Sequence, residues 1–220
     1  MTAALALAVV LALAAGPAQA ESAEGDAAPL DGAGTFLRPN ASRPDGAPVY
    51  LHVTPHDMPW RIAIGSPAVP PRYGSREDAR RAAIEAMQMW ERAIQPHLAW
   101  FRLEFVAEDA SAPVQVRWKR RITGPFGGFG RQQVSVVDGK QRVGGEIQVS
   151  TTPDLFTTLT VDEVRYLVAH EFGHVLGLGH CLDCDSAMNY AWHTRERVLV
   201  TDVDVRTFLA LVAQPDAPSQ

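Results

Sequence analysis

The sequence predicts an α+β fold in which helices pack against one twisted sheet. Apolar residues recur at spacings of three and four between Ser75 and Pro96, which indicates a helix. Short and alternating apolar runs indicate strands over 100–151, and a second helical pattern begins after Thr160. The chain has 220 residues, 46% of them hydrophobic and 20% charged, so one domain with a sizeable core and extensions is expected.

Residues 1–20 have the pattern of a secretory signal peptide. They carry no charged side chain, run through an Ala/Leu/Val block from Ala3 to Ala15, and end in the small-residue sequence Ala18-Gln19-Ala20. A membrane anchor is the alternative, but the apolar block is shorter than the ~20 residues that span a bilayer. We therefore expect these residues to be removed and the protein to be secreted or periplasmic, with no membrane attachment afterwards.

Residues 21–49 are rich in Ala, Gly, Pro and Asp and have almost no apolar periodicity. Such a segment cannot bury enough surface to order itself, which predicts a low-complexity linker or a short pro-segment. The folded domain is then expected over 50–213, followed by a tail at 214–220.

The first helix has clear boundaries. Ser75 is a suitable N-cap with Asp78 three residues on, and Pro96 stops the helix. Its apolar stripe consists of Ala79, Ala83, Met87, Trp90 and Ile94. Strands are expected before and after it, with a Gly-rich stretch over 124–130 and a turn at Asp138-Gly139. The predicted strands are 50–53 and 60–64 (one irregular or two short strands), 100–106, 114–118, 132–137 and 145–151.

The second helix begins with a capping box formed by Thr160 and Glu163. Its apolar stripe consists of Val161, Val164, Val168, Phe172 and Val175. At ~100° per residue, His170 and His174 project roughly 140° from the centre of that stripe, so the stripe packs inward and both imidazoles face a cleft.

Residues 170–180 read His-Glu-Phe-Gly-His-Val-Leu-Gly-Leu-Gly-His. The spacing of His170 and His174 stacks them one turn apart, so both can bind one metal ion. Glu171 lies between them in angle and can reach a metal-bound water without being a ligand, as a general base must. Gly177 allows the sharp turn that brings His180 to the same ion, and Gly179 adds a second flexible point. Three imidazoles leave a fourth position for water, which marks a catalytic site.

This segment resembles the metzincin signature, and Ser186-Ala187-Met188-Asn189-Tyr190 resembles the Met-turn that follows it. Met188 lies eight residues after His180, similar to the matrixin branch. The resemblance covers about 50–213. It implies a zincin fold with a twisted, mostly parallel sheet, an antiparallel edge strand, two long helices, a Met-turn and a C-terminal helix. It also implies one catalytic Zn²⁺ with a hydrophobic floor provided by Met188.

Tyr190 stands where astacin-like and serralysin-like relatives place a tyrosine that approaches the metal or the oxyanion. Matrixins differ at this position, so catalysis and plain packing both stay open for Tyr190. The chain also departs from matrixins in lacking the pro-segment cysteine that caps the zinc. It shows no recognisable second zinc site or calcium loop, and calcium binding stays open.

Cys181 and Cys184 are the two cysteines of the chain. In an exported protein they most simply form a disulfide, and a redox role or additional metal ligation is the alternative. After them, Thr201 caps a final helix, and Arg206 and the two nearby aspartates are expected on its solvated face. The apolar stripe of this helix consists of Val205, Phe208, Leu209 and Val212. The histidines expected to serve packing rather than metal binding are His52, His56, His97 and His193.

The function that follows is a secreted zinc-dependent endopeptidase in which Glu171 is the general base. In the catalytic alternative for Tyr190, this residue donates a hydrogen bond to the oxyanion. A peptide substrate is expected to add as a strand along 127–137, with 191–200 and Trp192 forming a pocket wall. The alternatives are a zinc-dependent binding module and a hydrolase of a non-peptide amide. The net charge of −5 is spread along the chain, so nucleic acid is not an expected partner, and we expect a monomer.

Overall fold

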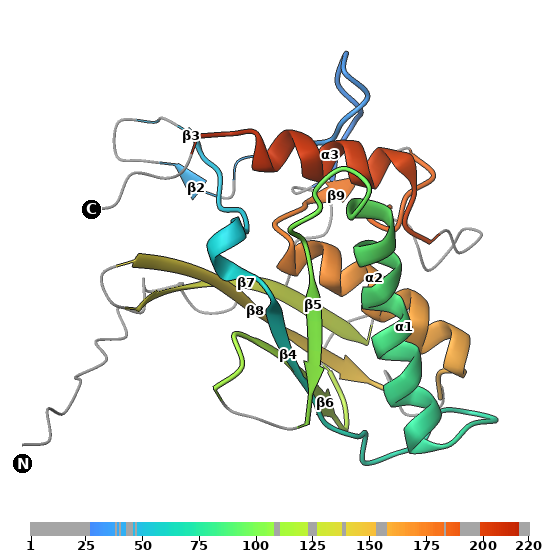
Figure 1. Cartoon of the computed structure of the whole chain (residues 1–220). Helices are drawn as coiled ribbons and strands as arrows, with labels where there is room; N and C mark the ends of the chain where they lie inside the picture. The colour runs from blue at the N-terminus through green and yellow to red at the C-terminus, as the bar shows by residue number, and fades with distance from the viewer. Residues whose placement is uncertain are drawn as a thin grey trace, which may run out of the picture.

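The computed structural model describes residues 27–37, 39, 41–42, 46, 48–107, 111–122, 127–137, 140–152, 158–182, 184–189 and 199–215. The central sheet has five strands in the order β5-β4-β6-β8-β7. All neighbours are parallel except β7, an edge strand that runs antiparallel to β8 (Figure 1). The predicted mostly parallel sheet with an antiparallel edge strand is confirmed. Its strands are β4 (Trp60–Ile64), β5 (Leu103–Val106), β6 (Val114–Lys119), β7 (Gly128–Val137) and β8 (Lys140–Ser150).

The strand predictions differ from the structure mainly at their boundaries. Residues 50–53 form no strand, and a 3-10 turn, η1 (Pro55–Asp57), separates them from β4. Strands β7 and β8 both begin earlier than predicted because glycines lie inside them, and the predicted Asp138-Gly139 turn falls outside the described residues. Glycine in a strand marks a place where another backbone approaches closely. In β7 the close neighbour of Gly130 is the backbone carbonyl of Glu171, and in β8 the close neighbour of Gly144 is the backbone carbonyl of Pro113.

Helix α1 (Arg76–Ile94) begins as predicted. The backbone N–H of Asp78 donates to Ser75 Oγ at 3.0 Å, and the backbone N–H of Ser75 donates to the Asp78 carboxylate at 2.8 Å. All members of the predicted apolar stripe are fully buried. This stripe packs against α2 (Val161–Val175), which has the predicted capping box between Thr160 and Glu163.

Helix α2 is covered on more sides than its stripe predicts. It packs against α1 on one side and against β7 and β8 on another (Figure 1). His170 and Glu171, on the face expected to line a cleft, are 4% and 3% exposed, whereas His174 is half-buried. The periodicity of the helix could not show this, because strand β7 and the turn around Met188 that cover this face are distant in sequence.

Part of the N-terminal segment is ordered, so the expectation that 21–49 does not order itself is wrong for residues 27–37. Strand β1 (Ala27–Ala28) pairs in parallel with β9 (His180–Cys181), and Phe36 is only 1% exposed. A second short pairing joins β2 (Ala41–Ser42) to β3 (Pro48–Val49). The low-complexity composition hid two large apolar side chains, Phe36 in the core and Leu37 packed against it.

Helix α3 (Asp202–Val212) crosses the end of the domain above α1 and α2 (Figure 1). The prediction that both aspartates lie on its solvated face is wrong for Asp204, which is 0% exposed, whereas Asp202 is exposed. Leu209 and Val212 are half-buried, and Leu211 takes the fully buried position. No helix among the described residues is both long enough and apolar enough to cross a membrane.

Candidate active site

Three histidines converge at one point. His170 and His174 come from successive turns of α2, and His180 comes from β9. One ligand atom from each lies within 4.8 Å of the others, and they are the one such group of three or more His, Cys, Asp or Glu in the described ranges. The Nε2 atoms of His170 and His180 are 3.1 Å apart. The structure therefore brings together the three predicted metal ligands.

Gly177 makes this convergence possible. Its φ is +97°, and its backbone N–H donates to the carbonyl of His174 while that of Leu178 donates to Gly173, both at 3.0 Å. This is the Schellman pattern that ends a helix on a left-handed residue. A Cβ atom at Gly177 would also lie 2.9 Å from the carbonyl oxygen of Leu51. Gly179 does not share the positive φ, so the reversal rests on Gly177.

Backbone carbonyls set the tautomers of two of the histidines. Nδ1 of His170 lies 2.7 Å from the carbonyl oxygen of Ala187, and Nδ1 of His174 lies 2.9 Å from that of Leu178. A carbonyl oxygen only accepts, so Nδ1 carries the proton in each ring and Nε2 keeps its lone pair. Hydrogen bonds of this kind orient imidazoles that bind metals.

The donor set fits a zinc ion. Three imidazoles whose ligand atoms lie within 4.8 Å of one another match the donor set of a catalytic zinc site. Two ligands of a tetrahedral ion with Zn–N bonds of 2.0–2.1 Å are separated by about 3.3 Å. The measured separation of 3.1 Å is close to this value.

Glu171 lies under the edge strand. A Cβ atom at Gly128 would be 2.5 Å from Glu171 Oε1, and one at Gly130 would overlap the carbonyl oxygen of Glu171. These two glycines bring β7 directly onto α2, next to the carboxylate. In the sequence, residues 124–130 are recognisable only as a Gly-rich stretch, although glycines that immediately precede a strand can indicate a close backbone approach.

Met188 packs against α2 at Gly173. It is fully buried, and a Cβ atom at Gly173 would overlap its sulfur and lie 3.1 Å from its Cε. The backbone N–H of Cys181 donates to the carbonyl of Met188 at 2.8 Å. Gly173 directly precedes His174 in the motif, and its missing side chain leaves room for that of Met188.

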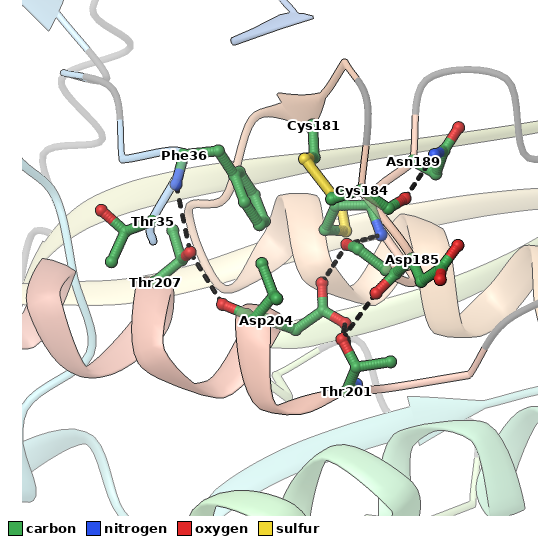
Figure 2. The surroundings of a disulfide bond; sticks show 12 residues. Thr35, Phe36, Cys181, Cys184, Asp185, Asn189, Thr201, Asp204 and Thr207 are labelled. Carbon is green, nitrogen blue, oxygen red and sulfur yellow. Dashed lines mark hydrogen bonds between the residues drawn. A yellow bond between two sulfur atoms is a disulfide. The ribbon is translucent and has the colours of Figure 1, made fainter. Parts of the chain in front are cut away.

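Asp204 holds the turn that carries Met188 (Figure 2). Its carboxylate accepts from Ser186 Oγ, from the backbone N–H of Ala187 at 3.0 Å and from that of Thr201 at 2.8 Å. Burial raises the pKa of the Asp204 carboxyl, although the hydrogen bonds from Ser186, Thr201 and Ala187 oppose the change. The carbonyl of Ala187 accepts from His170, and the N–H of Ala187 donates to Asp204. Asp204 is therefore linked to the imidazole of His170 through one residue. Sequence reasoning missed the burial of Asp204, although its place three residues after the N-cap Thr201 marks it as a capping-box residue, which Asp202 is not.

Cys181 and Cys184 form a disulfide directly after His180, with an S–S distance of 2.02 Å (Figure 2). Both cysteines are buried, and the side-chain amide of Asn189 donates to the carbonyl of Cys184. Of the alternatives for this pair, the structure has the disulfide. It closes the loop that leads from the third histidine to Met188.

Some predicted site residues lie outside the described residues. These are Tyr190, Trp192 and His193, together with the remainder of 191–198. Of the other histidines expected to serve packing, His52 is buried, whereas His56 and His97 are exposed.

Three imidazoles converging from a helix and the strand after it, with a glutamate between the first two, define a zinc metallopeptidase of the metzincin type. A model of the matrixin family matches residues 53–211, well over half of the chain. The chain belongs to the matrixin family and is a zinc-dependent endopeptidase acting on protein or peptide substrates. A search of the curated proteins finds no match to it.

Proposed function

We propose that this protein is an exported endopeptidase in which Glu171 is the general base. The observation that carries the proposal is the placement of Glu171, which is buried between the two helical histidines and directly under the glycines of β7. His170, His174 and His180 would hold a zinc ion, which would supply a Lewis acid and make water nucleophilic near neutral pH. Glu171 then accepts the proton of the attacking water and returns it to the leaving amine.

The edge strand β7 is the surface along which we propose that the substrate binds. One side of β7 pairs with β8, and the other side has no neighbouring strand in the described sheet. An extended peptide can add there through backbone hydrogen bonds. Because Gly128 and Gly130 lie on Glu171, a peptide bound along this end of β7 passes next to the general base. Two further roles are proposed from the sequence: residues 191–200, with Trp192, form a wall of the substrate pocket, and Tyr190 assists the oxyanion.

Export is supported by the disulfide. Disulfides persist in oxidising compartments, and Cys181–Cys184 lies in the core of the site rather than at the surface. A signal peptide over residues 1–20 is consistent with export. The N-terminal residue of the protein recovered outside the cytoplasm, read by mass spectrometry, tests the cleavage after Ala20.

Glu171→Gln tests the mechanism. Glutamine has the shape of glutamate but cannot act as a base. Peptide release from a mixed protein substrate is therefore expected to fall by at least ~10³-fold, while one zinc ion stays bound. Asp162→Asn is the control, because Asp162 is an exposed carboxylate on the same helix, and it should leave activity unchanged. Equal activity of Glu171→Gln and the wild type would reject Glu171 as the base. Zinc binding without peptide release in the wild type would favour a binding module.

A further inference from the structure

Residues 27–37 lie beside the strand that carries the third histidine. Strand β1 runs parallel to β9, with Ala27 opposite His180 and Ala28 opposite Cys181. The backbone N–H of Leu182 donates to the carbonyl of Ala28 at 2.9 Å. The backbone of the N-terminal segment is thus hydrogen-bonded at the position of a zinc ligand.

A well-defined turn then redirects this segment. The Asp31 carboxylate accepts from the backbone N–H of Thr35 at 2.8 Å and from its hydroxyl at 2.6 Å. The backbone N–H groups of Asp31 and Gly34 donate across the same turn, and Gly34 has a φ of +70°. These contacts are local to the sequence Asp-Gly-Ala-Gly-Thr, and they send the chain from β9 towards α3.

Phe36 anchors the segment on α3. Its side chain is 1% exposed and belongs to the main apolar core. Its backbone N–H donates to Thr207 Oγ1 at 3.3 Å, and Thr207 is itself fully buried (Figure 2). Truncation of the Phe36 side chain would leave a cavity in this core.

We propose that residues 27–37 are a permanent part of the active enzyme, in which they position β9 and therefore His180. The inference rests on His180 being a zinc ligand in the proposed function, but not on the hydrolysis of peptides. Strand β9 has only two residues, and its backbone hydrogen bonds go to β1 on one side and to Met188 on the other. A strand this short depends on both neighbours to keep a fixed place.

This role is the opposite of that of an inhibitory pro-segment. An inhibitory segment covers the metal, and its loss raises activity. The described contacts of residues 27–37 go instead to the backbone of β9 and to a buried threonine of α3, which are contacts that stabilise the domain. Loss of this segment should therefore weaken zinc binding rather than activate the enzyme.

Two variants of the full chain test the proposal. Phe36→Ala removes the apolar anchor, and Thr207→Val removes the acceptor of the Phe36 N–H at nearly constant volume. Zinc affinity is measured by competition with a chromogenic chelator, and the ligand geometry by the visible absorption spectrum after Co²⁺ substitution. The matched control is Leu30→Ala, which truncates an exposed apolar side chain of the same segment.

The expected result for Phe36→Ala is a zinc affinity lower by about tenfold, the loss typical when groups that orient metal ligands are removed. Thr207→Val should change it in the same direction by less, and Leu30→Ala should not change it. If Phe36→Ala does not fold, Thr207→Val decides. Unchanged zinc affinity and Co²⁺ spectrum in the variants would overturn the proposal, as would higher peptide release from Phe36→Ala.

The mass of the purified active protein provides a second test. The first residue of the zinc-loaded form should lie at or before Ala27. An active form that begins after Phe36 and keeps wild-type zinc affinity would overturn the proposal. If no peptidase activity is found, the zinc and Co²⁺ measurements still decide between a positioning segment and an inert one.

Discussion

The indole nitrogen of Trp90 donates a hydrogen bond of 2.8 Å to the carbonyl oxygen of Ala169, the residue before His170. The same ring reaches the next turn of α2, because a Cβ atom at Gly173, the residue before His174, would lie 3.1 Å from Trp90 Cζ2. One fully buried side chain of α1 therefore contacts the zinc helix immediately before each of its two histidines.

Trp90→Phe is expected to disturb the metal site as well as the fold. The change removes the donor to Ala169 and leaves a small cavity, which together should lower the free energy of unfolding by about 2 kcal/mol. Because the displaced turns carry His170 and His174, kcat should fall more than KM rises. Stability is measured by urea denaturation and activity by steady-state kinetics.

Trp118→Phe is the control for Trp90→Phe. It removes a similar indole hydrogen bond of 2.9 Å, here to the carbonyl of Gly65, which is not part of the site. The control should lose some stability and keep kcat. If both variants lose kcat equally, Trp90 has no particular influence on the zinc helix.

Gly173→Ala should destabilise the protein even though alanine favours helices. The substitution alone would gain about 1 kcal/mol in an open helix. The new Cβ atom would overlap the sulfur of Met188 and lie 3.1 Å from Trp90 Cζ2, and both side chains are fully buried, so overpacking by about 1–3 kcal/mol is expected to prevail. Denaturation of Gly173→Ala, Met188→Ala and the double variant gives the coupling between them. Purely additive effects would contradict a direct clash.

Gly130→Ala should separate β7 from the zinc helix. The clash is with the backbone carbonyl of Glu171, which cannot rotate aside, so stability should fall by about 2 kcal/mol and kcat should fall as Glu171 shifts. Gly32→Ala is the matched control, because a Cβ atom there meets nothing within 4 Å. That variant should stay within about 0.5 kcal/mol of the wild type. A change in the stability of Gly130→Ala as small as that of Gly32→Ala would show that β7 is not in close contact with α2 at Gly130.

Asp204 should make stability depend on pH in the direction opposite to an ordinary surface carboxylate. Burial raises its pKa in the folded state above the ordinary value of 3.8, so between these two values the folded state binds more protons than the unfolded state. The free energy of unfolding therefore falls as pH rises through that window. Asp204→Asn removes this contribution, and the difference between wild type and Asp204→Asn, measured with zinc removed from both, should become less favourable to the wild type as pH rises.

A comparison of Asp204→Asn with Asp204→Ala separates the charge of Asp204 from its hydrogen bonds. Asparagine keeps an oxygen for the Ala187 and Thr201 N–H groups, whereas Asp204→Ala leaves these buried donors unpaired at a cost of about 3 kcal/mol. Asp202→Asn, on the exposed side of the same helix turn, is the control and should have little effect. A pH profile for Asp204→Asn that is identical to that of the wild type would reject the assignment of the slope to this carboxyl.

The sequence by itself determined the features that depend on neighbours within one or two helical turns. The capping boxes at Ser75 and Thr160, the spacing of His170 and His174, and the left-handed turn at Gly177 are all of this kind. The local backbone geometry of a helix and its ends makes such patterns recognisable without knowledge of the rest of the fold.

Only the tertiary structure decided which distant residues hold that site in place. Asp202 and Asp204 both lie in the first turn of α3, but the burial of Asp204 depends on contacts with Ser186 and Ala187, which lie many residues earlier in the chain. Phe36 lies in a segment whose average composition predicts disorder, yet its side chain is buried in a core that distant parts of the chain form. The role of Gly128 and Gly130 is visible only in the structure, where the absence of their side chains lets β7 lie against Glu171. In each case the deciding free energy comes from burial and hydrogen bonding between parts of the chain that the sequence keeps apart.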